Sequence, residues 1–293
     1  MAIGAAAEIK GKLNLVDVIG ETVQLRRAGT AWKGLCPFHG EKTPSFTVTP
    51  ARESWKCFGC GRGGDLFGFV MERDGCDFPT ALRQLAARAG VELSERTSRE
   101  DAERKRLRDV LEAAIAFYHL VLTTHRAGTA ALAYLHGRGF TDATIATFQI
   151  GYAPGSWDAL TKALAARRGF SEADLDAAGL VVRRQRGNGV YDRFRDRVIF
   201  PIRDASGNAT GLGGRVVGKH DPATQGGKYL NSPATLLFDK SRTLFLIDRA
   251  KAGIRRTGRA VLVEGNTDAL MAHQAGFDNV VGTLGTALTA GHV

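Results

Sequence analysis

The sequence has little cysteine: four residues among 293, and three of them lie between positions 36 and 60. This scarcity excludes a small secreted protein held by disulfides and points to a reducing, cytoplasmic compartment. No run reaches the roughly 18 consecutive apolar residues of a membrane span. The N-terminus lacks a basic segment followed by a continuous apolar one, so we do not interpret it as a signal peptide. We therefore expect no membrane partner.

Proline is also infrequent, at 8 residues, whereas hydrophobic residues make up 44% of the chain. That composition supports packed cores, and the length predicts two or three structural units. We expect an α+β multidomain protein. The segments predicted are a β-sheet unit at 1–93, a linker at 94–110, a mixed α/β region at 111–258, and a strand–helix–strand unit at 259–293.

The formal net charge of +10 is concentrated in one segment. Residues 181–259 hold 17 Lys and Arg against 6 Asp and Glu, a net charge of +11, which leaves −1 for the rest of the chain. A charge that serves only solubility would be spread more evenly. The segment therefore predicts a surface that binds a polyanion.

The clustered cysteines form a metal-ligand pattern. Cys36 and His39 are separated by two residues, and so are Cys57 and Cys60. Two such pairs, carried on tight turns and brought together by antiparallel strands, provide four tetrahedral ligands for Zn²⁺. Because all four ligands come from the protein, we expect one structural zinc ion. Ordinary buried thiols with a histidine nearby are the alternative.

Aromatic and basic residues are interspersed around this cluster. Trp55 and Phe58 lie among several lysines and arginines. These rings either pack the small core of the sheet or stack on the bases of single-stranded nucleic acid. The pattern leaves both possibilities open.

In the basic segment, Arg193, Arg195 and Arg197 alternate with other residues. In an extended strand the three would share one face and could follow a phosphate backbone. A solvated edge strand is the alternative. Further candidate ligands of nucleotides or nucleic acid lie in or beside glycine-rich turns and in a following loop: Arg215, Lys228, Tyr229, Asn231 and Lys240.

Two carboxylates follow an apolar strand near the end of the sequence. Glu264 comes directly after "AVLV", and Asp268 lies four residues further on. Ligand sites of α/β sheets lie at the carboxyl ends of strands, and carboxylate oxygens suit Mg²⁺ or Mn²⁺. Alternatively, Asp268 only stabilises the first turn of a helix.

Taken together and in this order, the motifs resemble the N-terminal half of the bacterial DNA primase family. "CPFHGEKTPSF" with "WKCFGCGRGGDLFGF" is similar to its zinc-binding domain. "YDRFRDRVIFPIRD", "GLGGRV", "KYLNSP" and "LFDKSRTLF" are similar to its RNA-polymerase core, and "VLVEGNTDAL" to the opening of its Toprim fold. The resemblance covers nearly the whole chain.

The resemblance implies a nucleotidyltransferase that makes short RNA primers from NTPs on a single-stranded DNA template during replication. It implies a zinc ribbon that helps to select the start site, and a replicative helicase as partner. Glu264 would be a catalytic residue, as metal ligand or general base, and Asp268 the second acid of the motif. Arg195, Arg215, Lys228 and Lys240 match basic positions that handle template and nucleotide, and Tyr229 and Asn231 lie in the same loop.

The chain departs from the family pattern in two ways. The family motif usually reads Glu-Gly-Tyr-Met-Asp, but Asn266 and Thr267 stand in its middle here. The next metal motif, an Asp-x-Asp, and the helicase-binding domain are not within the sequence. We therefore expect this chain by itself to bind single-stranded DNA but to polymerise weakly. The alternative is a zinc-dependent DNA-binding module without polymerase activity.

Overall fold

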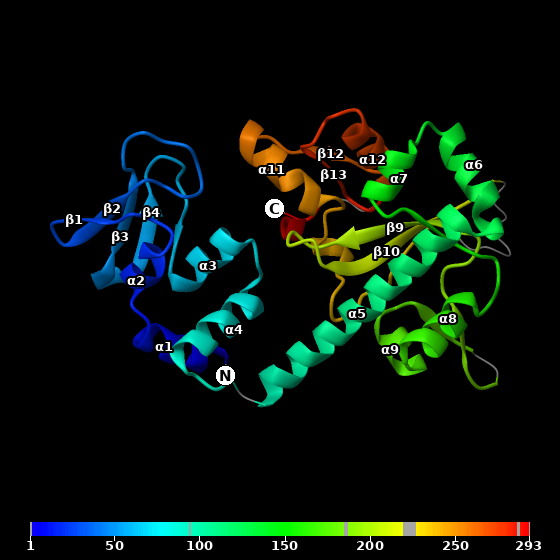
Figure 1. The fold of residues 1–293 in the computed structure, drawn as a ribbon, viewed down its shortest axis with the longest axis horizontal. Helices are drawn as coiled ribbons and strands as arrows, with labels where there is room; N and C mark the ends of the chain where they lie inside the picture. Colours follow the sequence, from blue (N-terminus) through cyan, green and yellow to red (C-terminus); the bar gives the residue numbers. More distant parts are fainter. Residues whose placement is uncertain (1, 94, 185–186, 219–226, 286–287, 293) are drawn as a thin grey trace. The chain divides into compact units, whose positions relative to one another are not determined.

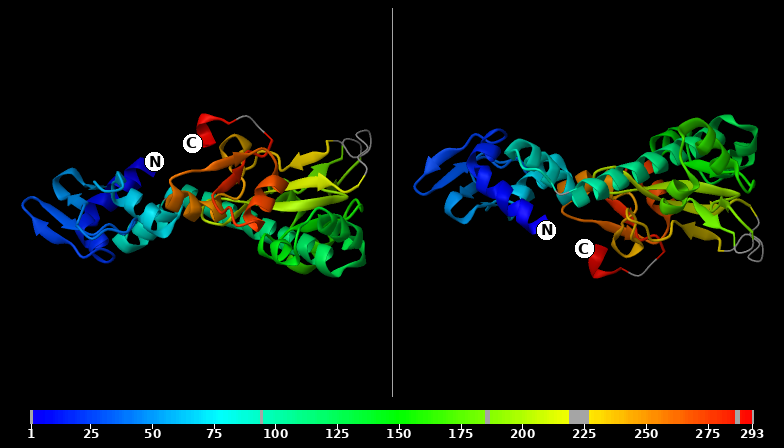
Figure 2. Two further views of the ribbon diagram at one scale, coloured as in Figure 1. Left: turned by 90° about the horizontal axis from the view of Figure 1, so that it is seen from above. Right: turned by 90° about the horizontal axis from the view of Figure 1, so that it is seen from below.

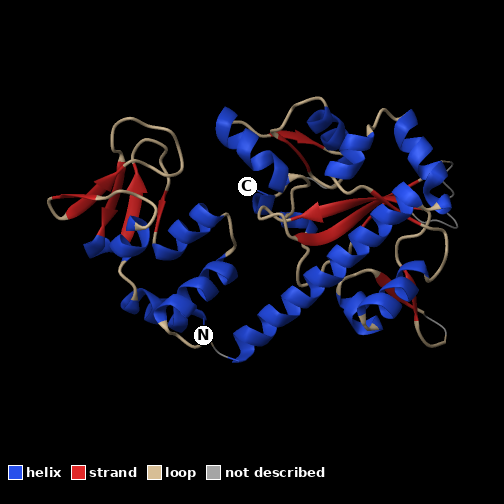
Figure 3. Ribbon diagram, viewed as in Figure 1, coloured by secondary structure: helices blue, strands red, loops and turns tan. Residues whose placement is uncertain are grey.

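The computed structural model describes residues 2–93, 95–184, 187–218, 227–285 and 288–292. The chain divides into two compact units between Ala102 and Glu103, and each is described here by itself (Figure 1). Both contain helices and strands, as Figure 3 shows, which confirms the predicted α+β class. No helix among the described residues is long and apolar enough to cross a membrane.

The first unit is a five-stranded antiparallel sheet with strands in sequential order, together with four helices. These helices add to the β-sheet unit predicted for 1–93. The elements are α1 (Ala2–Lys12), α2 (Leu15–Gly20), β1 (Arg26–Ala28), β2 (Ala31–Gly34), β3 (Phe46–Thr49), η1 (Pro50–Arg52), β4 (Ser54–Cys57), β5 (Gly63–Gly64), α3 (Leu66–Asp74) and α4 (Phe78–Ala89).

One face of this sheet forms the core of the unit. Phe46 and Val48 of β3 point inward, while Thr47 and Thr49 alternate with them toward solvent. Phe46 stacks on Trp55 at 5.2 Å between ring centroids, and Phe69 of α3 meets Trp55 edge-on at 5.8 Å. These aromatic contacts lie at the centre of a core that aliphatic side chains of the helices complete.

The segment predicted as a linker at 94–110 is helical from Glu95 onward, because α5 runs without a break over Glu95–Thr124. Its mixed charges form pairs along the helix, such as Lys105 with Asp109 at 2.8 Å. Such pairs at a spacing of four residues stabilise a helix. Leu107 and Val110 are buried in the core of the second unit, so the part of the predicted linker from Glu103 onward belongs to that unit.

In the residues that the structure describes, the second unit contains three sheets and the helices that cover them. Its further helices are η2 (Arg126–Gly128), α6 (Thr129–Gly137), α7 (Asp142–Thr147), α8 (Ala159–Arg168), α9 (Glu172–Ala177), η3 (Lys240–Arg242), α11 (Ile247–Thr257), α12 (Asn266–Gln274) and η4 (Ala290–His292). Its strands are β6 (Gly151–Ala153), β7 (Val181–Arg183), β8 (Val190–Asp192), β9 (Arg197–Arg203), β10 (Ala209–Val216), β11 (Tyr229–Asn231), β12 (Val261–Val263) and β13 (Val280–Gly282).

The central sheet has the order β11-β10-β9-β6, and all its pairs are antiparallel. Both faces of β9 are buried: Ile199 packs into a cluster with α5, whereas Val198 and Phe200 pack into a cluster with α6 and α12. Burial on two sides explains the nearly continuous apolar run of this strand. Figure 2 shows α5 lying along the sheet in two views.

The predicted strand–helix–strand unit is present, because β12 and β13 pair in parallel and α12 connects them. The apolar segment "LFLID", which by composition suits a strand, is not one. Only Phe245 makes a β-bridge, to Gly282, and the chain then turns through Leu246, whose φ is 65°, into α11. A left-handed residue cannot continue a strand, and this one redirects the chain into the helix.

Candidate zinc site and nucleic-acid interface

The four predicted zinc ligands converge. One ligand atom from each of Cys36, His39, Cys57 and Cys60 lies within 4.8 Å of the others. The Sγ atoms of Cys36 and Cys60 are 3.9 Å apart, close to the ~3.8 Å that zinc–sulfur bonds of about 2.3 Å impose across a tetrahedron. Cys36 follows β2 and Cys57 ends β4, so neighbouring regions of one sheet bring the two pairs together. The donor set fits a structural zinc ion.

The prediction that Trp55 could stack on a base was wrong. Trp55 is only 2% exposed, and its indole Nε1 donates to the carbonyl of Asp65 at 3.0 Å. Its side chain belongs to the core face of β4. Phe58 differs, because 71% of it is exposed and Lys56 Nζ lies 5.8 Å from its ring centroid. Phe58 therefore remains a candidate for base stacking.

A row of cations that the sequence analysis missed crosses the outer face of the same sheet. Arg26 pairs with Lys33, Lys33 with Thr47, and Thr47 with Lys56. Directly opposite residues project from the same face, so these four form one line across four strands. We call it the cationic row. The short turn between Ala28 and Ala31 was the signal in the sequence, since it fixes Arg26 opposite Lys33.

Like charges placed directly opposite each other destabilise a strand pair. Arg26, Lys33 and Lys56 are nevertheless all exposed on one face, and Arg26 and Lys33 also line an open cleft of about 530 Å³ together with Lys42. An anionic ligand would offset this repulsion. The cationic row is thus a candidate interface for phosphates.

The three arginines expected to share one face do not. Only Arg197 lies in a strand, and Asp196, with φ of 50°, interrupts the extended backbone before it. Arg197 is 3% exposed and donates to the carbonyls of Gly227 and Lys228. Arg193 is half-buried beside the core residue Phe194. The alternating charge pattern suggested a strand, but the chain bends at Arg193 and is left-handed at Asp196, so it is not extended there.

Arg195 has a different environment. Its guanidinium lies 4.1 Å from the ring of Trp157 and 5.0 Å from that of Tyr191, and it donates to the carbonyl of Asp192 at 2.7 Å. Trp157 is 55% exposed. Stacked arginine and aromatic groups suit single-stranded nucleic acid. The sequence did not predict a role for Trp157, because no local pattern connects it to Arg195, which lies far along the chain.

Asp192 holds this stack in place. Its carboxylate accepts hydrogen bonds from the backbone N–H groups of Leu160 at 2.8 Å and Thr161 at 3.1 Å, at the start of α8. Its own N–H donates to the carbonyl of Trp157 at 2.8 Å. Burial raises the pKa of Asp192, although these hydrogen bonds act in the opposite direction. This acid therefore stabilises structure and contributes no surface charge.

Arg215 is held between two tyrosines. It is 8% exposed, and its guanidinium lies 5.2 Å from the ring of Tyr134 and 5.7 Å from that of Tyr229. Its Nε has no hydrogen-bond partner within the part of the chain that the structure describes. Lys228 and Tyr229 are exposed beside it. A buried, incompletely satisfied guanidinium is a candidate for binding a ligand.

The two remaining predicted residues, Asn231 and Lys240, lie in β11 and η3. Asn231 Nδ2 donates to the carbonyl of Leu284, after β13, at 3.1 Å. Lys240 begins η3, and its carbonyl lies 3.1 Å from His292 Nε2. Asn231 thus connects the antiparallel β10–β11 hairpin, which we call the basic hairpin, to the parallel β12–β13 pair.

The two predicted carboxylates are both exposed at the carboxyl end of β12. Glu264 follows the strand directly, and Asp268 lies in the first turn of α12. Asn266, between them, is 7% exposed, and its Nδ2 is 2.6 Å from where a Cβ on Gly213 would stand. The turn that carries the carboxylates therefore packs directly on β10. Arg215 lies two residues from Gly213, on the same face of that strand.

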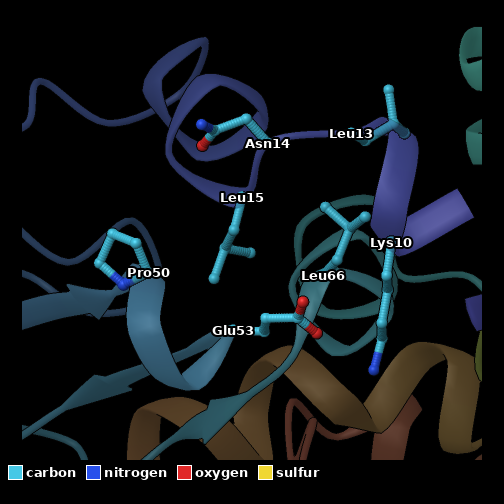
Figure 4. A pocket seen from close by; sticks show the side chains of 7 residues that line it. All are labelled: Lys10, Leu13, Asn14, Leu15, Pro50, Glu53 and Leu66. Carbon is cyan, nitrogen blue, oxygen red and sulfur yellow. The ribbon is translucent and has the colours of Figure 1, made fainter.

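A small cavity of about 160 Å³ in the first unit contains none of the predicted site residues (Figure 4). Figure 4 shows aliphatic side chains around it, with the charged ends of Lys10 and Glu53 nearby. Its lining is Lys10, Leu13, Asn14, Leu15, Pro50, Glu53 and Leu66. The described geometry gives it no chemical role.

Family models match three successive parts of the chain. Residues 4–101 match the CHC2 zinc finger, residues 117–251 the N-terminal domain of the DNA primase catalytic core, and residues 258–293 the Toprim domain. The fold and these matches thus define a protein with an N-terminal zinc ribbon, followed by the N-terminal domain of a primase catalytic core and a Toprim segment.

Similar proteins agree with these matches. A DNA primase of Halalkalibacterium halodurans is 45% identical over 288 residues, which cover 96% of this chain and 47% of that protein. The Aquifex aeolicus primase structure, with zinc-binding and RNA-polymerase domains, has a TM-score of 0.58 and 34% identity; the match covers 98% of this chain and 68% of that one. The structure of a DnaG primase catalytic domain bound to ssDNA has a TM-score of 0.57 and 37% identity, with 66% and 59% covered.

The chain belongs to the bacterial DNA primase family. It spans about half the length of the curated relatives it matches, 47%, 47% and 45% of three of them.

Proposed function

We propose that the protein acts as a DNA primase, which polymerises NTPs into short RNA primers on a single-stranded DNA template. The observation that carries this proposal is the packing of Asn266 on Gly213. It brings the carboxylate-bearing turn of β12 and α12 next to the strand that carries Arg215. Carboxylates for a metal ion beside cations for phosphates are what a phosphoryl-transfer site needs.

Glu264 and Asp268 would hold Mg²⁺ or Mn²⁺. Both are exposed carboxylates, and hard oxygen ligands of this kind are those that these cations prefer. When bound, such an ion stabilises negative charge on the reacting phosphate oxygens. Among the residues of this chain, Glu264 carries the main role as metal ligand or general base.

The template would contact both units. In the first unit, the cationic row would bind phosphates and Phe58 would stack on a base, in keeping with a zinc ribbon that selects the start site. In the second unit, Arg195 with Trp157 would hold the strand. The DNA-bound relative supports a DNA template for this family member.

The nucleotide and primer would contact the basic hairpin and the neighbouring η3. We assign this role to four residues of the hairpin and one of η3: Arg215, Lys228, Tyr229, Asn231 and Lys240. Arg193 and Arg197 contribute indirectly, since the packing described above gives them structural contacts.

The domain organisation we propose is a zinc-binding domain at 1–93, the N-terminal part of the catalytic core at 111–258, and the start of a Toprim domain from 259. A replicative helicase in the bacterial cytoplasm would be the partner. Neither the cationic row nor the carboxylate site requires a membrane.

The test is template-dependent synthesis of RNA by the protein isolated from its source cells, with Mg²⁺ or Mn²⁺. The expected result is short, alkali-sensitive products that disappear in a Glu264→Gln variant that still binds the template. Glu172→Gln, an exposed acid at the start of α9, is the matched control. Tight DNA binding without any synthesis would instead support a DNA-binding module.

A further inference from the structure

Glu41 lies at the centre of a hydrogen-bond network around the zinc ligands. Its Oε1 accepts from the backbone N–H of Cys36 at 2.8 Å and of Ser45 at 3.1 Å. Its Oε2 accepts from the hydroxyl of Ser45 and lies 3.2 Å from His39 Nε2. The side chain is 10% exposed, and the described residues place no lysine or arginine against it. This carboxylate is therefore not part of a surface ion pair.

The contact with Glu41 fixes which nitrogen of His39 can bind zinc. His39 Nδ1 lies 3.8 Å from Cys57 Sγ, toward the other ligands, whereas Nε2 lies toward Glu41. Gly59 leaves room for the ring, because a Cβ there would stand 2.7 Å from Nε2. A proton on Nε2 that is donated to the carboxylate leaves the Nδ1 lone pair free for the metal. Carboxylate–histidine pairs orient metal ligands in this way.

Ser45 extends the network to the second cysteine pair. Its Oγ lies 3.2 Å from Cys57 Sγ and accepts from the N–H of Gly59 at 3.2 Å. Its carbonyl accepts from the N–H of Phe58 at 3.0 Å. Glu41 and Ser45 together thus contact both ligand pairs of the zinc site.

If Glu41 served only to hold the loop backbone, its Oε1 would be enough, because this oxygen accepts from two backbone N–H groups. Its Oε2 has a different role, since it faces the side chains of His39 and Ser45. We propose that Glu41, with Ser45, is a positioning pair that holds His39 in the Nδ1-coordinating form and locks both ligand pairs around zinc. The Ser45 side chain also holds the backbone at Gly59, next to Phe58. The consequence of this contact for DNA binding rests on the proposed function.

The first measurement is the tautomer of His39 in the zinc-loaded wild-type protein, read from ¹⁵N–¹H correlations of its ring. The expected pattern is a metal-bound Nδ1 and a slowly exchanging proton on Nε2. Coordination through Nε2 would overturn the proposal, whatever the variants do.

The second measurement is zinc affinity, by competition with a chromophoric chelator. Glu41→Ala should lower affinity about 10- to 100-fold, the usual effect of removing such a partner. Glu41→Gln should lose the slow Nε2 proton while the loop stays folded. Glu92→Gln, the same change at an exposed site of the first unit, should leave affinity unchanged. If Glu41→Ala binds zinc within twofold of wild type, the pair has no positioning role.

A third measurement separates this inference from the proposed function. Ser45→Ala keeps the backbone bond to Phe58 but removes the Oγ acceptor of the Gly59 N–H, next to Phe58. The zinc-saturated variant should therefore bind single-stranded DNA more weakly if Phe58 stacks on a base. Reduced zinc affinity with unchanged DNA binding would keep the positioning role at zinc and reject only the connection to Phe58.

Discussion

The contrast between Phe58 and Trp55 provides a quantitative test of the interface in the first unit. The two rings are three residues apart, but Phe58 is 71% exposed and Trp55 is 2% exposed. Replacing Phe58 by alanine should remove a stacking contact worth about 1–3 kcal/mol per base, which corresponds to roughly 5- to 150-fold weaker binding of single-stranded DNA. The free energy of unfolding should hardly change, because the exposed ring buries little apolar surface in the folded protein.

Trp55→Ala should do the opposite. The indole packs against Phe38, Phe46 and Phe69 at 5.2–5.8 Å, so its loss should cost about 3–5 kcal/mol of the free energy of unfolding. Fluorescence anisotropy with a labelled oligonucleotide measures binding, and thermal unfolding with zinc quantification measures stability. If Phe58→Ala binds DNA as tightly as wild type at low salt, base stacking at this position is refuted.

Three further predictions concern the rest of the chain. Gly213→Ala should cost about 1–3 kcal/mol in thermal unfolding, because its Cβ would stand 2.6 Å from Asn266 Nδ2, whereas Gly155→Ala, with open space around it, should be neutral; equal stability of the two would contradict the packing. Arg106 lowers the pKa of Asp174, so the ionised carboxylate stabilises the fold at a pH above its ordinary pKa near 4, and this stabilisation is lost as the pH falls through the lowered pKa. Arg106→Gln should therefore make the free energy of unfolding fall less steeply between neutral and acidic pH. An unchanged pH dependence would argue against the pair. Removing zinc with a chelator should abolish the unfolding transition of the first unit and leave that of the second, and calorimetry that shows both transitions intact would exclude a structural role for zinc.

The zinc ligands could be predicted from sequence because their chemistry is local. A two-residue gap brings Cys36 and His39, or Cys57 and Cys60, onto one tight turn, whatever the rest of the chain does. The parallel β12–β13 unit was equally accessible, since its order of strand, helix and strand leaves few arrangements.

Other features depend on contacts between distant residues. The pairing of Arg195 with Trp157 and of Arg215 with Tyr134 arises from tertiary packing, which one sequence does not encode locally. The stacking role considered for Trp55 failed for a related reason: alternation along a strand separates its two faces but does not say which face is the core. At Arg193, an alternating charge pattern suggested a strand, but the chain bends there and Asp196 has a left-handed backbone.

The central claim is that the carboxylates after β12 hold a divalent cation directly beside β10. Replacing that cation with Fe²⁺ and generating hydroxyl radicals cuts the backbone near the bound metal. The account predicts cuts within the Glu264–Asp268 turn and within β10 around Gly213, both lost in the Glu264→Gln variant. Cuts confined elsewhere, or a pattern that the substitution leaves unchanged, would contradict it.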